Sequence, residues 1–290
     1  MDNRDDIRAF LTSRRARITP EQAGVPFFGG KRRVPGLRRE EVAMMAGVST
    51  DYYTRLERGN LSGVSDSVLA SVASALRLDE AETSHLFDLA RAARAGARST
   101  RARSTVLRAR DGIQLMLDSI EAAPAFVRNA RMDLVAGNLL CRALYSPLFT
   151  ASARPVNHSR FIFLNPAARH FYLDWDRAAD DNVAILRTEA GRNPFDRGLT
   201  DLVGELSTRS HEFCIRWASH AVSLHHSGSK TIVHPVVGEL DLEYNALDML
   251  ADPGLTLTIY NAVRSSSTEE KLRLLASWAL SNTGATVPVE

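Results

Sequence analysis

A glycine–serine bend between two short helical patterns is the feature that most constrains how this chain folds. Before the bend, Val42, Ala43 and Ala46 can form the inner face of a short helix. Gly47 suits a sharp turn, because glycine adopts positive φ without steric cost. Ser49 can cap the next helix by accepting a hydrogen bond from a free backbone N–H. The pattern therefore predicts two short helices packed across a tight turn.

The second of these helices has an apolar inner side and a polar outer side. Tyr53 and Leu56 lie three residues apart and are expected to face inward. Gly59 suits a left-handed helix stop, and residues 68–78 supply a further amphipathic helix that closes the bundle. The outer side is formed by Thr50, Asp51, Tyr52, Thr54 and Arg55.

Charge is unevenly distributed along the chain. Residues 1–110 carry 20 Lys and Arg against 13 Asp and Glu, whereas residues 111–290 carry 16 against 21, although the net charge is only +2. This balance indicates that only the first part meets a polyanion. Hydrophobic residues (44%) and charged residues (24%) are present at levels typical of globular proteins. No segment approaches the roughly 20 apolar residues of a membrane span, and the first residues lack a signal-peptide pattern, so we expect a cytoplasmic protein.

Composition also suggests where the domains divide. Residues 18–36 are rich in Pro and Gly and are predicted to form a loop. Residues 94–110 are basic and weakly apolar, which suits an exposed linker or a connecting helix. We therefore predict a helix-turn-helix domain over residues 1–93, a connecting segment over 94–124 and a second domain over 125–290.

The second domain mixes two kinds of pattern. Residues 125–138 are predicted to form strands around a turn, and residues 139–218 are mainly helical. Residues 221–263 give alternating, β-branched runs, within which His234-Pro235 is expected to begin a strand. A last helix is expected over residues 268–281. A central antiparallel sheet with helices grouped to one side follows, which is an α+β domain.

The first domain resembles the helix-turn-helix of the lambda-repressor-like (XRE) family. The matching residues have the family's spacing without insertion or deletion, and they are Val42-Ala43, Gly47-Val48-Ser49, Tyr53 and Glu57-Arg58-Gly59. The string RREEVAMMAGVSTDYYTRLERGN, the opening FLTSRRARITPEQAG and the C-terminal half together resemble the MmyB-like regulators of actinobacteria over nearly the full length. This resemblance implies a multidomain protein, with an all-α lambda-repressor-like domain followed by an α+β, PAS-like ligand-binding domain.

The resemblance also implies how the first domain binds double-stranded DNA, with the second helix of the motif in the major groove. Arg55 is suited to bidentate pairing with guanine, worth roughly 1–3 kcal/mol of discrimination. The other expected contacts are Arg39, Thr50 and Asp51 near base edges, Tyr52 and Thr54 on the same helix face, and Arg32, Arg33, Arg38 and Arg58 at phosphates. The alternative is a helical module that uses the same packing for protein contacts, with arginines that only solvate its surface.

For the second domain, the resemblance implies a small ligand, apolar or fatty-acid-like as in known relatives. A sheet curled over helices also leaves a natural place for such a ligand between the layers. The candidate ligand-binding residues are Phe161, Phe163, Phe171, Tyr172, Trp217, His220, Tyr244 and Tyr260. For each aromatic residue the alternative is ordinary core packing.

Other chemistry finds little support in the sequence. Four histidines crowd residues 220–234, but no Cys or carboxylate sits beside them at ligand spacing, so we expect no metal site. Cys141 and Cys214 are expected to be unpaired, buried thiols. There is no nucleophile elbow, phosphate-binding glycine loop or H-E-x-x-H motif, so we expect no enzyme and no cofactor.

These patterns favour a homodimeric repressor that binds an inverted-repeat operator, with half-sites about one helical turn apart. A ligand in the second domain would shift the placement of the two DNA-reading heads. One alternative is a ligand-independent DNA-binding regulator whose C-terminal domain is a protein-interaction or dimerisation module. A DNA-binding head fused to an enzyme is a further alternative, which no residue supports.

Overall fold

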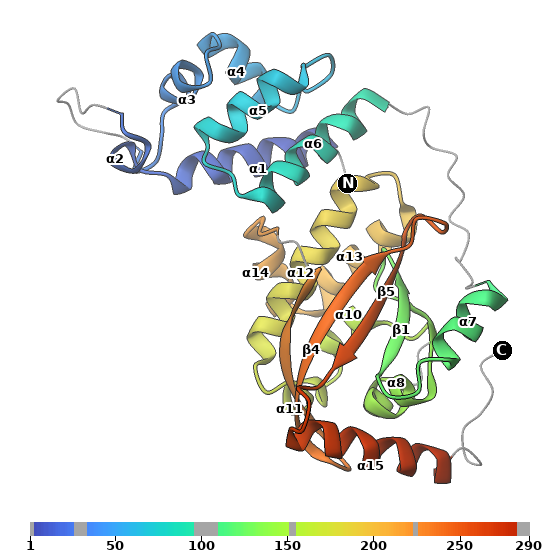
Figure 1. Ribbon diagram of the computed structural model, residues 1–290. Helices are drawn as coiled ribbons and strands as arrows, with labels where there is room; N and C mark the ends of the chain where they lie inside the picture. Colours follow the sequence, from blue (N-terminus) through green and yellow to red (C-terminus); the bar gives the residue numbers. More distant parts are fainter. Residues whose placement is uncertain (1–2, 26–33, 96–109, 151–154, 223–225, 283–290) are drawn as a thin grey trace. The chain divides into compact units, whose positions relative to one another are not determined.

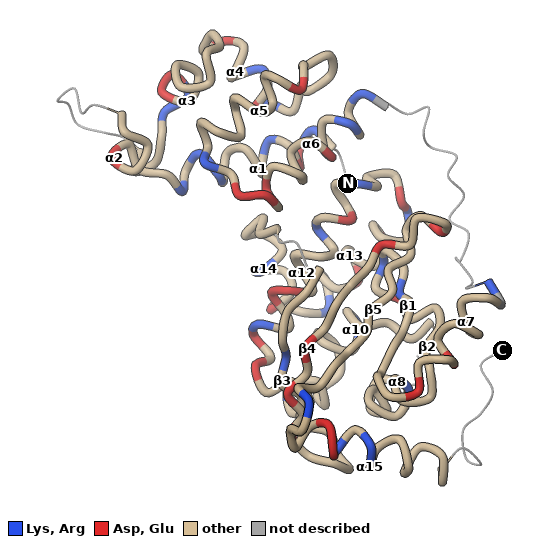
Figure 2. Tube along the Cα trace, in the orientation of Figure 1, with Lys and Arg blue, Asp and Glu red and all other residues tan. Residues whose placement is uncertain are grey.

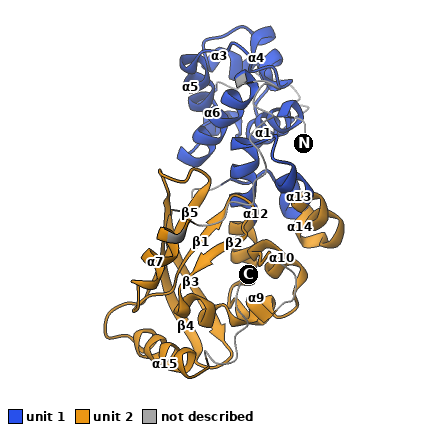
Figure 3. Cartoon of the chain, turned by 90° about the vertical axis from the view of Figure 1, so that its right-hand side faces the viewer, with its two compact units in different colours: residues 1–104, 183–201, 215–224 blue, residues 105–182, 202–214, 225–290 orange. Residues whose placement is uncertain are grey.

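The computed structural model describes residues 3–25, 34–95, 110–150, 155–222 and 226–282 (Figure 1). The chain forms two compact units that are not contiguous in sequence (Figure 3). Unit 1 comprises residues 1–104, 183–201 and 215–224, and unit 2 comprises 105–182, 202–214 and 225–290. Residues 96–109 of the predicted connecting segment lie outside the described residues, so its boundaries stay a prediction.

Unit 1 begins with a bundle of helices, which confirms the all-α class expected for the N-terminal part. The bundle has one core, in which Ile7, Phe10 and Leu11 pack with the inner residues of the later helices. The helices are α1 (Asn3–Arg17), α2 (Pro20–Ala23), α3 (Arg39–Met45), α4 (Thr50–Glu57), α5 (Asp66–Ala75) and α6 (Glu80–Ala95).

Helix α2 corrects the prediction of an uninterrupted loop over residues 18–36. Thr19 caps it by accepting from the backbone N–H of Gln22, and the Gln22 side chain accepts from the backbone of Thr19 in return. Pro20 stands at the first helical position, where its missing N–H costs nothing. The string T-P-E-Q carried this capping-box signal, which the high Pro and Gly content of the segment obscured.

Helix α1 packs so closely on the rest of the bundle that two positions have room only for glycine. A Cβ atom at Gly59 would lie 2.5 Å from the backbone oxygen of Arg4, and one at Gly36 would lie 2.5 Å from that of Ala16. Gly59 also has a φ of +89°, which side chains rarely adopt. Both ends of α1 are therefore fixed against the segments that flank α3 and α4.

Unit 2 is built on a five-stranded antiparallel sheet with the order β2-β1-β5-β4-β3. Together with the helices packed on it, this sheet confirms the expected α+β class. In the register, Tyr244 lies opposite Gly228 on one side and Tyr260 on the other. The strands are β1 (Ala125–Asn129), β2 (Leu134–Gly137), β3 (Ser227–His234), β4 (Gly238–Asp248) and β5 (Leu255–Asn261).

Helices of the second half pack mainly on one face of this sheet, where they build an aromatic core with Phe126, Leu240 and Tyr260. The long helix α12 contributes to both units, which divide at residue 183. The helices after β2 are α8 (Leu139–Leu144), α9 (Ser146–Thr150), α10 (His158–Leu164), α11 (Ala168–Phe171), α12 (Trp175–Arg192), α13 (Arg197–Arg209), α14 (His211–Ala218) and α15 (Ser267–Asn282).

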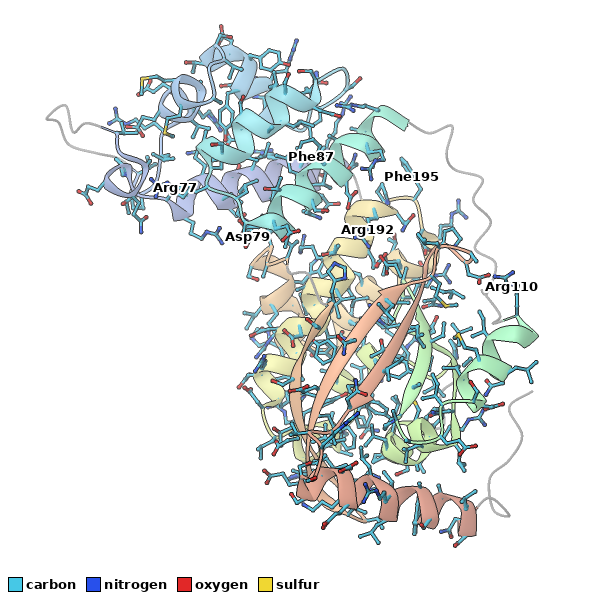
Figure 4. All side chains as sticks on the ribbon, viewed as in Figure 1. Arg77, Asp79, Phe87, Arg110, Arg192 and Phe195 are labelled. Atoms are coloured by element: carbon cyan, nitrogen blue, oxygen red, sulfur yellow. The ribbon has the colours of Figure 1, made fainter. Side chains whose placement is uncertain are left out.

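One helix departs from the predicted one-sided arrangement. Helix α7 (Asp111–Asp118) packs Ile113 and Leu117 against Val127, which points away from the aromatic core. Arg110, just before α7, pairs with Asp252 in the turn between β4 and β5 (Figure 4). The strand β1 is therefore buried on both faces, as its uniformly buried residues require.

Two smaller expectations are wrong. Pro235 does not begin a strand, because β3 ends at His234 and the chain turns back to pair Gly238 with that residue. Proline lacks the N–H that strand-to-strand hydrogen bonding needs, so a proline can follow the end of a strand as readily as it can precede a strand. Cys141 is buried, and burial raises its thiol pKa to about 12, but Cys214 is exposed on α14. The neighbouring Phe213 is the residue that α14 buries there.

Candidate functional sites

The turn between α3 and α4 has the predicted construction. Gly47 has a φ of +67°, and the N–H of Val48 donates to the carbonyl of Ala43 at 3.0 Å. The Ser49 hydroxyl accepts from the N–H of Tyr52 at 3.1 Å, which caps α4. The sequence was sufficient here because every one of these contacts is local.

Helix α4 divides its side chains as expected. Tyr53 and Leu56 have no exposed surface, which confirms the predicted inner face. The outer residues differ among themselves, with Thr50, Asp51 and Arg55 exposed and Tyr52 and Thr54 half-buried. The guanidinium carbon of Arg55 lies 4.9 Å from the centroid of the Tyr52 ring. The ring thus supports the arginine without removing it from solvent.

Glu57, at the end of α4, is a buried carboxylate with only 2% of its side chain exposed. It accepts from Arg15 Nε at 2.7 Å, from Arg39 Nε and from the Thr12 hydroxyl at 3.3 Å. Arg15 also donates to the carbonyl of Leu37 at 2.8 Å. One acidic group therefore ties α4 to α1 and α3.

From the sequence, Glu57 was identified only as part of the motif, and this role was not predicted. A signal was present, because Glu57 lies four residues after Tyr53 and so on the inner stripe of α4. An acid at such a position needs a buried partner. The two arginines that supply it lie 42 and 18 residues away, which no local pattern reveals.

The expected DNA-contacting arginines lie in different surroundings. Arg39 is half exposed at 49% and is held by Glu57, so its contact with bases stays a prediction. Arg38, which precedes α3, and Arg58, which follows α4, are both exposed. Arg32 and Arg33 lie outside the described residues. Figure 2 shows the basic residues of these helices along the chain trace.

Six of the eight candidate ligand residues belong to one buried aromatic cluster in unit 2. Neighbouring rings meet mostly edge-on, with centroids 5.7 Å apart for Phe161 and Phe171 and 6.2 Å apart for Tyr244 and Tyr260. The hydroxyl oxygens of Tyr145 and Tyr260 are 2.7 Å apart and share a hydrogen bond. The six residues are Phe161, Phe163, Phe171, Tyr172, Tyr244 and Tyr260.

A lysine that was not predicted as a site residue lies among these rings. Lys230 Nζ is 5.1 Å from the centroid of Tyr244, 5.4 Å from that of Tyr260 and 5.9 Å from that of Tyr172. The side chain is half-buried and shares the inner face of β3 with Ile232. We call Lys230 and these three tyrosines the lysine cage.

A buried histidine lies close to the lysine cage. His158, at the start of α10, has its ring 4.7 Å from that of Tyr145 and is only 5% exposed. Burial, reinforced by the positive charges of Lys230 and Arg128, lowers the pKa of His158 to about 3. Its Nε2 atom is buried and has no hydrogen-bond partner among the described residues.

Trp217 and His220 belong to unit 1, whereas this cluster belongs to unit 2. In unit 1 the Arg187 guanidinium carbon lies 4.0 Å from the Trp217 ring centroid, and Arg187 Nη1 lies 2.9 Å from His220 Nδ1. Burial and then the charge of Arg187 lower the pKa of His220 to about 4. Their assignment to a ligand site stays a prediction.

The histidine-rich segment has a structural use where it is described. His234 Nε2 lies 3.0 Å from the carbonyl oxygen of Ala143, which joins β3 to α8. Burial lowers the pKa of His234. Within the described part of the chain, no three His, Cys, Asp or Glu residues gather as a metal site would require.

Comparison with known families gives two matches. Residues 109–275 match the family described as the MmyB-like transcription regulator ligand binding domain, which is more than half of the chain. The chain belongs to this family. Residues 7–86 of this MmyB-like regulator match a helix-turn-helix domain, and no curated protein matches the chain. The resemblance found in the sequence is thereby confirmed.

The two matches assign a role to each site. The bundle that contains α3 and α4 is the DNA-binding domain of the MmyB-like regulator, and the sheet with its aromatic cluster is its ligand-binding domain. The chain is therefore a transcription regulator that responds to a ligand. None of the described helices is long and apolar enough to cross a membrane.

Proposed function

We propose that this MmyB-like regulator is a repressor that reads its operator with α4 and releases or binds it in response to an apolar ligand. The supporting observation is the exposure of Thr50, Asp51 and Arg55 on a helix whose inner face is fixed by Tyr53 and Leu56. A rigid helix with a free polar N-terminal half fits the major groove. Since its partner is chromosomal DNA, we place the regulator in the cytoplasm.

Arg55 is the residue to which we assign base reading. Its guanidinium group is exposed and offers the paired N–H donors that match guanine in the major groove. The Tyr52 ring beside it limits the rotamers that the arginine samples, so less side-chain entropy is lost on binding. Arg38 and Arg58 are assigned to phosphates, which position the protein without reading sequence.

We further propose a homodimer on an inverted repeat. A single short helix contacts too few base pairs for the affinity of a typical repressor. Two copies would present two α4 helices to half-sites about one helical turn apart. Sedimentation of the regulator with an operator duplex tests this, and one copy per operator would contradict it.

The proposed ligand is apolar and fatty-acid-like. The aromatic cluster of unit 2 supports this, because rings from α10, α11, β4 and β5 converge on one apolar region. Ligand sites are commonly lined by such side chains, with a few polar groups that fix orientation. A ligand that binds one arrangement of the DNA-reading heads better than another changes operator affinity.

The DNA assignment is tested on an operator obtained by selection from a random duplex library. Arg55→Ala should relax the base preference at one position of each half-site, because only the guanine contact is lost. Arg58→Ala should weaken binding to all sequences alike and reduce its salt dependence. Arg273→Ala, which removes an exposed arginine from α15, is the control and should change neither. Equal, sequence-independent losses from Arg55→Ala and Arg58→Ala would contradict the role of Arg55.

A second candidate function has one observation in its favour. Helix α15 exposes Leu274 (63%), Trp278 (36%) and Leu280 (67%), as a protein-interaction module would. The regulator would then bind DNA independently of a small ligand. Operator affinity that stays constant across a titration with apolar acids and alcohols would favour this candidate.

A further inference from the structure

Two late segments of the chain complete unit 1. Residues 183–201 and 215–224 belong to this unit, although they fall within the match to the ligand-binding family (Figure 3). Val222 is only 9% exposed and packs in the same core as Ile7 and Phe10 of α1. Within unit 1, the DNA-binding helices therefore contact chain that is part of the ligand-binding match.

The polar contacts of these segments converge on His220. Its backbone has a φ of +54°, a left-handed conformation that is strained for any residue with a Cβ atom. Its carbonyl oxygen accepts from Arg14 Nη2 of α1 at 2.5 Å, and its ring Nδ1 lies 2.9 Å from Arg187 Nη1 of α12. Because a guanidinium group can only donate, Nδ1 is the acceptor. Two arginines from different helices thus hold one strained residue in place.

Both arginines are buried, with 4% of each exposed. Arg14 also pairs with Glu82 of α6 at 2.9 Å. Arg187 stacks on the Trp217 ring and donates to the Trp217 carbonyl. Burial lowers the pKa of Arg187 to about 10, and the negative charge of Asp6 on α1 opposes this shift. We call Arg14, Arg187, Trp217 and His220 the arginine clasp.

The end of α12 is packed on α6 beside the clasp. Arg192 Nε lies 3.3 Å from the buried carboxylate of Asp88 (Figure 4). A Cβ atom at Gly191 would lie 2.5 Å from Cε1 of the His85 ring. The last two turns of α12 are therefore close to the helix that follows the DNA-reading motif, and a small shift of α12 must change these contacts.

The same helix also contributes to the aromatic cluster of unit 2. Trp175 and Ala179, in the first turns of α12, are buried members of that cluster. Arg187 lies on the same continuous helix, eight residues after Ala179. Because a regular helix moves as a rigid element, a displacement of its first turns also displaces Arg187.

We propose that the arginine clasp is a coupling device, through which α12 links the ligand-binding domain to the DNA-binding helices. This rests on the proposed function, in which a ligand in the aromatic cluster changes operator affinity. In the structure Arg187 holds the segment at His220. A shift of α12 withdraws its guanidinium group, and the strained backbone then loses one of its two holds. Since Arg14 of α1 binds the same residue, this loss reaches the DNA-binding helices.

The test measures the operator affinity of the full-length chain with and without decanoate, which serves as the probe. The wild-type ratio of the two affinities should lie at about 5–150, the usual range of allosteric coupling. Arg187→Met keeps an unbranched side chain and removes the donors, so its ratio should fall to within about twofold of one. Arg209→Met is the matched control, because Arg209 is exposed on α13 and pairs with Glu205 at 2.9 Å. It should keep the wild-type ratio.

A second variant and a second measurement make the test independent of how Arg187→Met folds. His220→Gly accepts the left-handed backbone without strain and removes only the ring, so it should fold and still lower the ratio toward one. Amide hydrogen exchange of a peptide that covers residues 215–222 reports on the clasp directly. Decanoate should change this exchange in the wild-type chain and in Arg209→Met, but not in Arg187→Met.

The outcomes separate this proposal from the proposed function. If Arg187→Met or His220→Gly binds operator and decanoate and keeps the wild-type ratio, the clasp is overturned and the ligand response stands. A wild-type response without any change of exchange at 215–222 also overturns the clasp alone. Loss of decanoate binding in Arg187→Met would make Arg187 a ligand contact and would overturn the clasp. If decanoate leaves the operator affinity of the wild-type chain unchanged, the apolar ligand of the proposed function fails, and the clasp fails with it.

Discussion

Two regions of the molecule treat a buried charge in opposite ways. In the DNA-binding domain, Glu57 is almost completely buried and is bonded by Arg15 and Arg39. In the ligand-binding domain, Lys230 is half-buried among tyrosine rings and has no acidic partner in the described residues. A charge with protein partners holds helices together, whereas a charge without one is available for something from outside. The contrast separates a structural ion pair, at Glu57, from a charge at Lys230 that no ion pair among the described residues explains.

The strongest test of the contrast removes the paired charge. Glu57→Gln should lower the free energy of unfolding by about 3–5 kcal/mol, because it leaves Arg15 and Arg39 buried or half-buried without their acid. Urea unfolding of the full chain, followed by the circular dichroism of the helices, measures this. Glu40→Gln is the control, since Glu40 is exposed and pairs with Arg38 at 3.4 Å. A loss from Glu57→Gln no larger than the control's would refute the role given to Glu57.

The next test uses a feature that both regions share, which is a buried neutral histidine. His85 in unit 1 and His158 in unit 2 each have a pKa lowered to about 3, mainly by burial. Unfolding returns each pKa to about 6.5, so the unfolded chain binds more protons and stability is complete only above that pH. As pH falls from 6.5 toward 3, each histidine should cost about 1.4 kcal/mol of stability per pH unit.

Replacing either histidine should flatten this pH dependence by one proton. His158→Gln removes the contribution of unit 2, and unfolding midpoints measured between pH 7 and pH 4 give the slope. His211→Gln is the control, because His211 is exposed on α14. An unchanged slope in His158→Gln would show that the imidazole is not held neutral by the surroundings described here.

A smaller effect is expected where α4 begins. Ser49→Ala removes the side-chain acceptor for the N–H of Tyr52 and should cost about 1 kcal/mol of stability. Because the helix that carries Arg55 then frays at its first turn, operator affinity should fall together with stability. Ser71→Ala on α5, where the hydroxyl donates only to the carbonyl of Ser67, is a suitable control. If the two alanines behave alike, the cap does not order α4.

The smallest expected effect is also the most direct test of the contrast. Lys230→Met should change the free energy of unfolding in the absence of ligand by less than about 0.5 kcal/mol, or raise it, because no ion pair is lost. Thermal unfolding of the ligand-free protein measures this change in stability. A large loss of stability would place Lys230 with Glu57 as a structural charge, and the comparison between the two domains would collapse.

The same comparison explains how far the sequence could predict the structure. The turn at Gly47, the cap at Ser49 and the inner face of α4 were predicted because their contacts join residues a few positions apart. The lysine cage could not be predicted in this way. It depends on the register that sets Tyr244 beside Tyr260 and on α11, which brings Tyr172 to β3. Strand alternation can assign Lys230 to a face of β3 but does not identify its neighbours.

The candidate ligand residues were chosen because they are aromatic, and the sequence did not show where each one lies in the fold. Most of the aromatic ones do gather in one cluster, because large rings are buried wherever the sheet and helices meet. Trp217 has the same chemistry, yet it follows the division of the chain at residue 215 into unit 1. That division depends on tertiary contacts between distant segments, which composition does not encode.

The close approach of α1 to Gly59 and Gly36 has a consequence for signalling. With backbone against backbone near both of its ends, α1 is packed too closely on these segments to admit a side chain at either glycine. We therefore expect the helices of the DNA-binding domain to move as one rigid body. A ligand-induced change would then alter the placement of the whole DNA-binding domain and leave its internal structure unchanged.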